Sequence, residues 1–330
     1  MKHLVLLTIF LITFSSCIKD NIKIPDTGRK IVINGLLTTD TIINSLITRS
    51  NYLLDKDGIS YYNMIDYDSL EVVLYENNVK TDSLNHVRYS GFDPWKVFNF
   101  GNYVSEDNSP VPGKEYKIVV NGQGLPTASA STIIPDIVRI EDIDTSRIIL
   151  APGKYYSFDT GLLCRIGFSD PPEKENFYLL RITLKSYRKY GNTYSIPINY
   201  QDLEFYCSDP IVEEKLNTRE GIQAVAFSDM LINGQKHNID LVIKGELIGE
   251  PIIKLEYPFS STDIYRKTLN IKLYSITEEF FRYIQTLQLY SRNYSNPLAE
   301  PVLMESNVTG GYGMFSGASV STCSIEFNLF

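Results

Sequence analysis

Large apolar side chains alternate with polar ones along much of this 330-residue chain, and this alternation restricts the fold more than any other feature. The pattern is clearest in residues 178–184, 239–243 and 269–273, where every second side chain is aliphatic or aromatic. Successive side chains of a β-strand point to opposite faces, so a period of two predicts strands that bury one face in a core. We therefore expect a mainly β fold.

The first half of the chain carries shorter strand signals separated by turn residues. They lie at residues 31–33, 70–74 and 115–120. Asn77-Asn78 and Asn121-Gly122 supply residues that accept positive φ in tight turns. Several short strands without a helical period between them predict a β-sandwich of immunoglobulin or transthyretin type over residues 30–135, which ends at Pro135.

Residues 136–330 are expected to form a second β-rich domain that carries one long helix. Ser275 to Glu278 fits a capping box, with Ser275 as the N-cap and Glu278 bonding back to its amide. Apolar residues then recur at spacings of three and four, at Phe280, Tyr283, Ile284, Leu287, Tyr290 and Tyr294. This stripe predicts a helix near residues 276–295 that buries Phe280, Ile284 and Leu287 against the domain's sheet. A docking face for a partner is the alternative.

The first sixteen residues have the layout of a secretory signal peptide. An apolar run from Leu4 to Phe14 ends in two serines directly before Cys17. The run has about eleven residues, too few to span a bilayer as a helix, which needs roughly 20. Small residues before a cysteine resemble a lipobox, so we expect residues 1–16 to be removed, Cys17 to be acylated and residues 17–29 to form a tether. An ordinary secretory signal with a chance cysteine is the alternative.

Charge and cysteine count exclude some classes of function. A formal net charge of -8 argues against nucleic acid as a partner, because nucleic-acid binding requires a basic surface. Besides Cys17 the chain has Cys164, Cys207 and Cys323, an odd number that cannot pair completely within one chain. Alternation places Cys164 and Cys323 on apolar strand faces. Whether any two form a disulfide is left open, and the sequence lacks the clustered His and Cys of a zinc site. We expect no metal and no cofactor.

Catalytic motifs are absent from the sequence. It contains no GxSxG nucleophile elbow, no HExxH helix, no Walker loop and no CxxC. After the signal peptide only His86 and His237 could serve a histidine-dependent hydrolase. We therefore expect no enzyme and assign no catalytic residue. The 39 carboxylates and 23 tyrosines leave an envelope hydrolase acting on glycan or peptide as an alternative.

The densest group of glycines lies at residues 310–317. A loop that cradles phosphate leads into a helix, whereas this one leads into the strand pattern of Ser319-Val320-Ser321. We expect its glycines, Gly311 and Gly313 above all, to provide positive φ and close backbone packing. The loop is either a structural element or a docking loop for a partner. Its residues are Gly310, Gly311, Gly313, Met314 and Phe315.

An ordered set of segments resembles the Bacteroidota lipoprotein family catalogued as domain of unknown function 4249. The segments are Ile31 to Leu37, Pro112-Gly113 with Tyr116, Thr132 with Pro135, Phe227-Ser228-Asp229 with Gly234, Ser275 to Glu279 with Tyr283, Glu300-Pro301, and Ser306 through Phe315. They extend over nearly the whole chain after Cys17. The stretch from Asn307 to Phe315 is the most specific of them.

The resemblance implies a location and a partner more than a chemistry. Members look like outer-membrane lipoproteins encoded near TonB-dependent receptors, so we expect a non-enzymatic binding or accessory protein of a TonB-dependent nutrient transporter, attached to the bilayer through acylated Cys17. No catalytic residues are established for the family, and none are carried over. A surface adhesion or assembly module is a further alternative. The ligand, the oligomeric state and the face of the outer membrane are left open.

Overall fold

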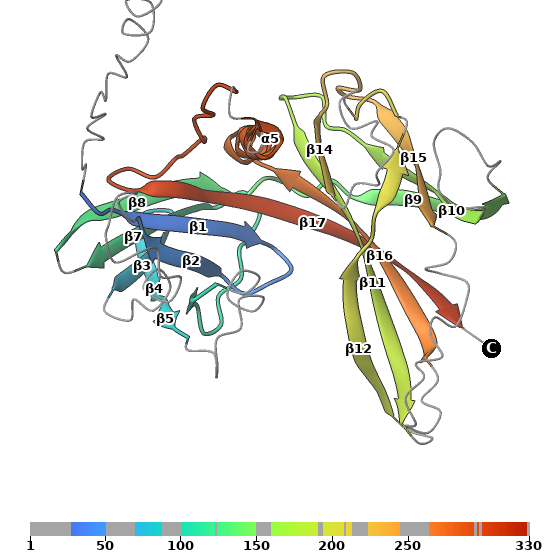
Figure 1. Ribbon diagram of the computed structural model, residues 1–330, viewed down its shortest axis with the longest axis horizontal. Helices are drawn as coiled ribbons and strands as arrows, with labels where there is room; N and C mark the ends of the chain where they lie inside the picture. Colours follow the sequence, from blue (N-terminus) through green and yellow to red (C-terminus); the bar gives the residue numbers. More distant parts are fainter. Residues whose placement is uncertain are drawn as a thin grey trace, which may run out of the picture.

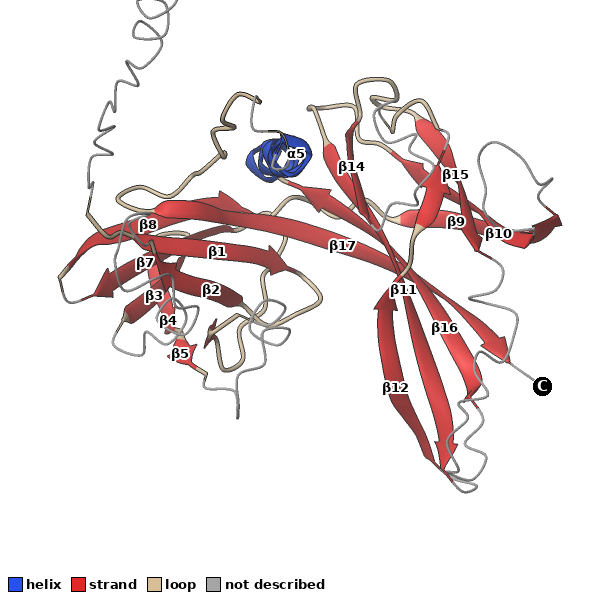
Figure 2. Cartoon of the chain, viewed as in Figure 1, coloured by secondary structure: helices blue, strands red, loops and turns tan. Residues whose placement is uncertain are grey.

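The computed structural model describes residues 28–50, 70–87, 101–122, 124–149, 160–190, 194–207, 209–212, 224–244, 264–293, 296 and 299–328. These residues form mainly β-strands in several sheets, with one long helix among them (Figures 1 and 2). The mainly β, sandwich-like fold with a single helix that the alternation predicts is confirmed for this part of the chain. The expected signal peptide, Cys17 and the tether up to residue 27 lie outside the described residues.

The largest sheet has nine strands and extends through both halves of the chain. Its strands are β1 (Ile31–Thr38), β2 (Asn44–Arg49), β5 (Asn85–His86), β6 (Tyr103–Val104), β11 (Phe177–Tyr190), β12 (Tyr194–Asp202), β14 (Ala224–Ser228), β16 (Ile264–Ile276) and β17 (Tyr312–Asn328). They follow the order β12-β11-β16-β17-β1-β2-β6-β5, with β14 beside β11. The sheet therefore joins strands that are far apart in the sequence.

Strand β17 connects the two halves of this sheet. It is 17 residues long. Tyr312 to Ala318 pair in parallel with β1, and Ala318 to Asn328 pair antiparallel with β16. The division into domains at residues 135 and 136 stays a prediction, and strand pairing crosses that position because β17 returns to β1.

Two four-stranded sheets pack on the large sheet and enclose separate cores. The first contains β3 (Glu71–Glu76), β4 (Val79–Ser83), β7 (Glu115–Gly122) and β8 (Leu125–Ile133), and the second contains β9 (Ile140–Ile149), β10 (Thr160–Ser169), β13 (Phe205–Cys207) and β15 (Lys236–Lys244). The first core lies between β1, β2 and the β3–β7–β8 strands. The second lies between β11, β16 and the β10–β15 strands. In Figure 1, β17 extends from the first unit into the second.

The alternating residues fill these cores as expected. Leu180, Ile182 and Ile271 of the large sheet are fully buried opposite Ile239 and Leu241. Each is a β-branched or γ-branched aliphatic residue on the inward face of its strand, where removing its surface from water stabilises the fold.

The cysteines behave as small apolar side chains. Cys164 is fully buried in the second core, and burial raises the pKa of its thiol to about 12. Burial also raises the pKa of Cys207 to about 11. In the described structure Cys164, Cys207 and Cys323 are free thiols. Their raised pKa values keep the first two protonated, which makes them poor nucleophiles at neutral pH.

The long helix, α5 (Glu278–Asn293), begins after Thr277 rather than Ser275. The prediction of Ser275 as the N-cap is wrong, because β16 continues to Ile276 and the Ser275 hydroxyl accepts a bond from the Val138 amide at 3.2 Å. Thr277 Oγ1 accepts from the Phe280 amide at 3.4 Å and caps the helix. Glu278 pairs with Arg282 one turn further on.

Helix α5 lies on the face of the large sheet that points away from the second core, and it is only half buried. Phe280, Phe281 and Ile284 pack on an apolar cluster of Phe177, Tyr274, Ile276, Ala318 and Val320. Leu287 is 42% exposed, so the prediction that it is buried is wrong. The apolar cluster supports only the first turns of the helix, and the stripe continues beyond it.

We expect the helix to respond differently to truncation at its two ends. Ile284→Ala should lower the free energy of unfolding by about 2 kcal/mol, the low end for aliphatic deletions because the side chain is half buried. Leu287→Ala should cost no more than about 0.5 kcal/mol, as at ordinary surface positions. Urea denaturation of both variants measures the difference, and equal losses would contradict this placement of α5.

Candidate functional site

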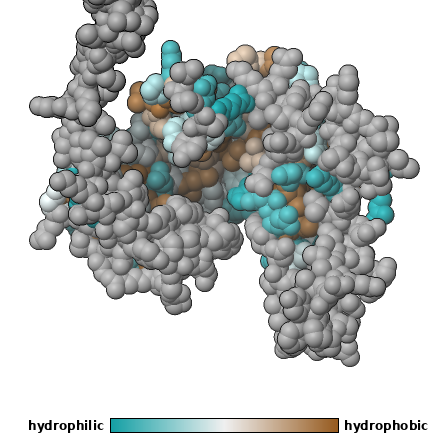
Figure 3. Space-filling model, viewed as in Figure 1, coloured by the Kyte–Doolittle hydropathy of each residue, from teal (hydrophilic) through white to brown (hydrophobic). Residues whose placement is uncertain are grey.

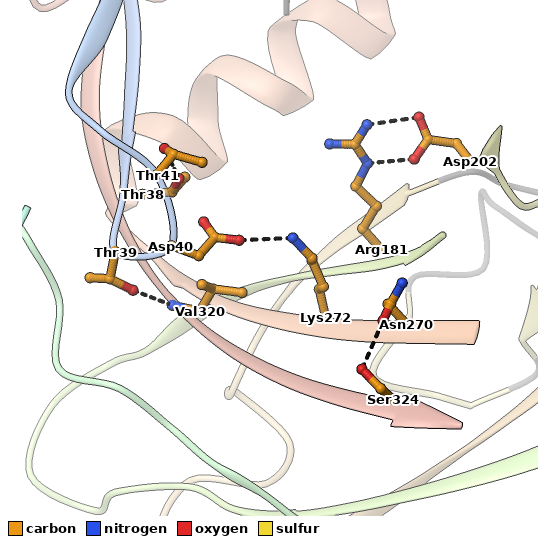
Figure 4. A network of polar contacts seen from close by, with 10 residues as sticks. All are labelled: Thr38, Thr39, Asp40, Thr41, Arg181, Asp202, Asn270, Lys272, Val320 and Ser324. Carbon is orange, nitrogen blue, oxygen red and sulfur yellow. Dashed lines mark hydrogen bonds and ion pairs between the residues drawn. The ribbon is translucent and has the colours of Figure 1, made fainter. Parts of the chain in front are cut away.

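Polar side chains gather on the helix-bearing face of the large sheet, directly beyond the apolar cluster under α5 (Figure 4). Leu179 pairs with Tyr274 in that cluster, and two residues further along the same strands Arg181 pairs with Lys272. Because alternate residues share a face, the apolar surface turns polar at this row. We call the group formed by Asp40, Arg181, Asp202, Asn270, Lys272 and Ser324 the charged seam.

Three pairs of side chains make up the seam. The Arg181 guanidinium donates two bonds to Asp202, both of 2.7 Å. Lys272 Nζ lies 2.8 Å from Asp40 Oδ2, and Ser324 Oγ donates to Asn270 Oδ1 at 2.7 Å. The side chains of both ion pairs are between 18% and 37% exposed. The seam is therefore partly shielded from solvent but reachable at the surface.

The turn between β1 and β2 supplies Asp40 and docks on β17. Its Thr39 amide donates to the Ala318 carbonyl at 3.3 Å, and Thr39 Oγ1 accepts from the Val320 amide at 3.1 Å. Thr38 and Thr41 join hydroxyls across the turn at 2.8 Å. These bonds lie where β17 leaves β1. The turn therefore supplies hydrogen-bond partners to the Ala318 carbonyl and the Val320 amide where the two strands separate.

The electrostatics of the seam favour its charged form. Burial raises the pKa of the Asp40 carboxyl, but the hydrogen bond and positive charge of Lys272 outweigh it, together with a bond from Thr38, so the pKa is lowered. The hydroxyls of Thr183 and Thr268, on the same face, are buried and have no hydrogen-bond partner. The seam thus presents paired charges and hydrogen-bonding groups on rigid strands, an arrangement suited to recognition.

A second polar cluster ties loops together at one end of the second core. Asp170, 4% exposed, accepts bonds from the Tyr178 hydroxyl and from the Gly234 amide. Asp229, 1% exposed, accepts from the Asn176 amide at 2.8 Å. Burial, and then the neighbouring Asp229 charge, raise the pKa of Asp170 despite its hydrogen bonds. The hydrogen bonds fix the loop ends around β10, β11 and β14, a structural role.

The glycine loop singled out in the sequence lies against β1 and β8 of the first unit. Gly310 and Gly313 have positive φ angles of 77° and 108°. A Cβ on Gly313 would lie 2.1 Å from the Ile33 carbonyl oxygen. The expectation for Gly311 is wrong, because its φ is not positive, yet a Cβ there would lie 2.4 Å from the Ile31 oxygen. At both positions β17 approaches β1 too closely for a side chain.

The other two residues of this loop are buried. Met314 is 3% exposed and Phe315 is fully buried in the first core. Asn307 bonds both the amide and the carbonyl of Phe315, at 2.9 and 2.7 Å. The structure brings all five loop residues together at the start of β17, but it does not bring them to the charged seam.

Sequence reasoning missed the seam. Its charged residues look like the solvent face of alternating strands, and Asp40 is separated from Lys272 by 232 positions. The one available signal is that Arg181 and Lys272 occupy corresponding positions in their strands. His237, considered above as a catalytic candidate, lies 2.9 Å from Asp209 and outside the seam.

Two sandwich-like units that share one large sheet, with one helix on its outer face within the described residues, define a mainly β protein. The chain belongs to the family described as a domain of unknown function (DUF4249), whose match covers residues 19–324. This confirms the resemblance carried by the ordered segments. A search among curated proteins finds no match. Within the described ranges no helix is long and apolar enough to cross a membrane, and no group of three or more metal-ligating side chains occurs.

Substitutions in the glycine loop should separate steric clash from backbone strain. Gly313→Ala combines positive φ with a clash against backbone and should cost about 3 kcal/mol or more. Gly311→Ala has only the clash, about 1–3 kcal/mol. Gly124→Ala is the matched control, since Gly124 has φ of 75° but open space around it, and should cost about 1 kcal/mol. Thermal melts rank the three, and equal losses would contradict the close packing of β17 on β1.

The Asp40–Lys272 pair should make stability depend on pH. The folded pKa of Asp40 is lowered, so its contribution is present above the unfolded value near 3.8 and is lost as pH falls through the folded pKa. Lys272→Met should cost about 0.5–1 kcal/mol at pH 7, the scale of a partly exposed ion pair, and less at pH 3. Urea unfolding at both pH values tests this, with Asp40→Asn/Lys272→Met as control. A loss that does not change with pH would refute the role of this pair.

Proposed function

We propose that the chain is a non-enzymatic lipoprotein of the outer membrane that serves as a binding or accessory partner of a TonB-dependent nutrient transporter. The charged seam is its contact surface. The observation that carries this proposal is the seam itself, a set of partly exposed ion pairs and hydrogen bonds fixed on the strands of the large sheet. The location and the transporter rest on the signal peptide, on Cys17 and on the family resemblance.

The composition of the seam suits a protein partner. Charged and polar groups on a rigid surface select a partner by complementary charge and increase the rate of encounter. The two bonds to Asp202 hold the Arg181 guanidinium in one orientation, so a partner meets a preformed pair of charges. Figure 3 shows hydrophobic and hydrophilic side chains side by side in the middle of the visible face, the mixed composition that protein interfaces have.

The tether keeps the body close to membrane proteins. The tether from Cys17 to Arg29 has 13 residues, which span at most roughly 45 Å when fully extended. Two or three acyl chains on Cys17 would hold the protein on the bilayer stably. The seam then meets a barrel protein in the same membrane far more often than a freely diffusing protein would.

Acylation of Cys17 is the first point to test. Cys17→Ala should release the protein from washed, diluted membranes, and mass spectrometry of the native N-terminal peptide should find an acylated cysteine. Membrane-bound protein with an unmodified Cys17 would refute the lipid anchor.

Capture of the transporter tests the seam. Tagged protein, solubilised gently from native membranes, should bring down a barrel protein. Arg181→Gln should reduce the recovered barrel about tenfold, the loss of roughly 1.4 kcal/mol of binding free energy. The matched control is Arg165→Gln. Arg165 forms the same two-bond pair with Asp240, at 2.8 Å, on the four-stranded sheet of the second unit.

Both variants should show thermal melts close to wild type, since exposed ion pairs contribute little to stability. Failure to capture any barrel protein would remove the transporter role. Equal loss with both arginines would remove the assignment to the seam.

A further inference from the structure

Helix α5 carries an exposed apolar patch on its later turns. Leu289 and Tyr290 are 48% and 45% exposed. Leu303, in the segment between α5 and β17, is 90% exposed. We call these three residues the α5 patch. None of the three belongs to the apolar cluster through which the first turns of the helix pack on the sheet.

The patch is a built surface, because the segment that bears Leu303 is held along the helix. Asn293 Nδ2 donates to the Glu300 carbonyl and the Glu305 amide donates to Thr286 Oγ1, both at 3.4 Å. These two contacts bracket the helical turn that contains Leu289 and Tyr290. Leu303 therefore lies beside that turn.

We infer that the α5 patch rests on the lipid surface to which Cys17 is attached. This inference rests on the proposed function, because it takes the membrane anchor from there. It adds a second contact with the bilayer and an orientation of the body. The occupant of the patch is the head-group and upper acyl region of a phospholipid bilayer.

The position of the tether supports this occupant. The described chain begins at Gly28, and Lys30 Nζ lies 4.9 Å from the centre of the Tyr312 ring at the start of β17. From Tyr312 the preceding segment leads back to α5. In Figure 1 the start of β1, this segment and α5 all lie along the upper side of the molecule. The tether therefore leaves the body on the side that carries the α5 patch.

The residue types of the patch also suit a lipid interface. Exposed leucine and tyrosine side chains enter the boundary between head groups and acyl chains, and basic side chains extend to the head groups. Arg292 lies on the last turn of α5, and Glu300 and Glu305 flank Leu303. Because charges of both signs surround the patch, apolar insertion rather than attraction to anionic lipid drives the contact.

The orientation has a consequence for the seam. The charged seam and α5 share one face of the large sheet. A body that rests on the α5 patch holds the seam close to the membrane surface, where a barrel protein presents its loops. The two contacts therefore act together.

An environment-sensitive fluorophore on Leu303→Cys tests the inference. The acylated protein is reconstituted in vesicles of phosphatidylcholine and phosphatidylethanolamine, which carry no net charge. The probe should shift its emission to the blue relative to the same labelled protein made with Cys17→Ala and measured without vesicles. The matched control is Val79→Cys, 66% exposed in β4, whose probe should not shift. Wild-type protein treated with the same fluorophore measures the background labelling of the native cysteines.

Co-sedimentation supplies an independent measurement. Cys17→Ala protein should bind the same vesicles at millimolar lipid, and Leu303→Ser should reduce the bound fraction at least threefold while Val79→Ser leaves it unchanged. An unshifted probe at residue 303 would overturn the inference. A probe that is shielded in native membranes but not in pure lipid would also overturn it, because that result identifies a protein as the occupant. Shielding that depends on protein concentration without vesicles would overturn it too, because that result identifies a second copy of the chain.

The inference and the proposed function fail separately. Loss of barrel capture with a shifted probe removes the transporter role and leaves the lipid contact. Normal capture with an unshifted probe removes only the lipid contact. An unmodified Cys17 removes the anchor, and co-sedimentation of the Cys17→Ala protein alone then decides whether the α5 patch contacts lipid.

Discussion

The double pairing of β17 is the constraint on which the rest of the structure depends. One strand of 17 residues pairs first with β1 and then with β16, so the hydrogen bonds of a single backbone join both halves. The same strand supplies Phe315 to the first core and Ile325 and Phe327 to the second. A break in β17 would therefore disturb both cores and the sheet between them.

The location of the charged seam follows from the point where β17 leaves β1. At Ala318 and Val320 the strand changes partner, and the turn carrying Thr39 and Asp40 fills the place beside it. Lys272 of β16 then meets Asp40 across the two halves. The surface that we propose for binding is thus a product of the junction, and the same contacts that stabilise the junction position its charges.

Helix α5 completes this face. Its first turns cover the apolar end of the sheet, whereas its later turns pass beyond the cluster and pair with the segment before β17. The helix therefore has one apolar surface that packs on the sheet and a second apolar surface that is exposed. The seam, the α5 patch and the start of the tether would then act as parts of one membrane-facing side.

The sequence by itself determined which residues face inward along each strand, because a period of two assigns Leu180, Ile182 and Cys164 to a core without knowledge of the partner strand. It also predicted the existence of one long helix. The N-cap at Thr277, the exposure of Leu287 and the ion pair between Asp40 and Lys272 were decided only by the tertiary structure. Their cause is long-range: where β16 stops pairing, how far the apolar cluster extends and which turn lies beside β17 depend on contacts between residues hundreds of positions apart, which no local pattern records.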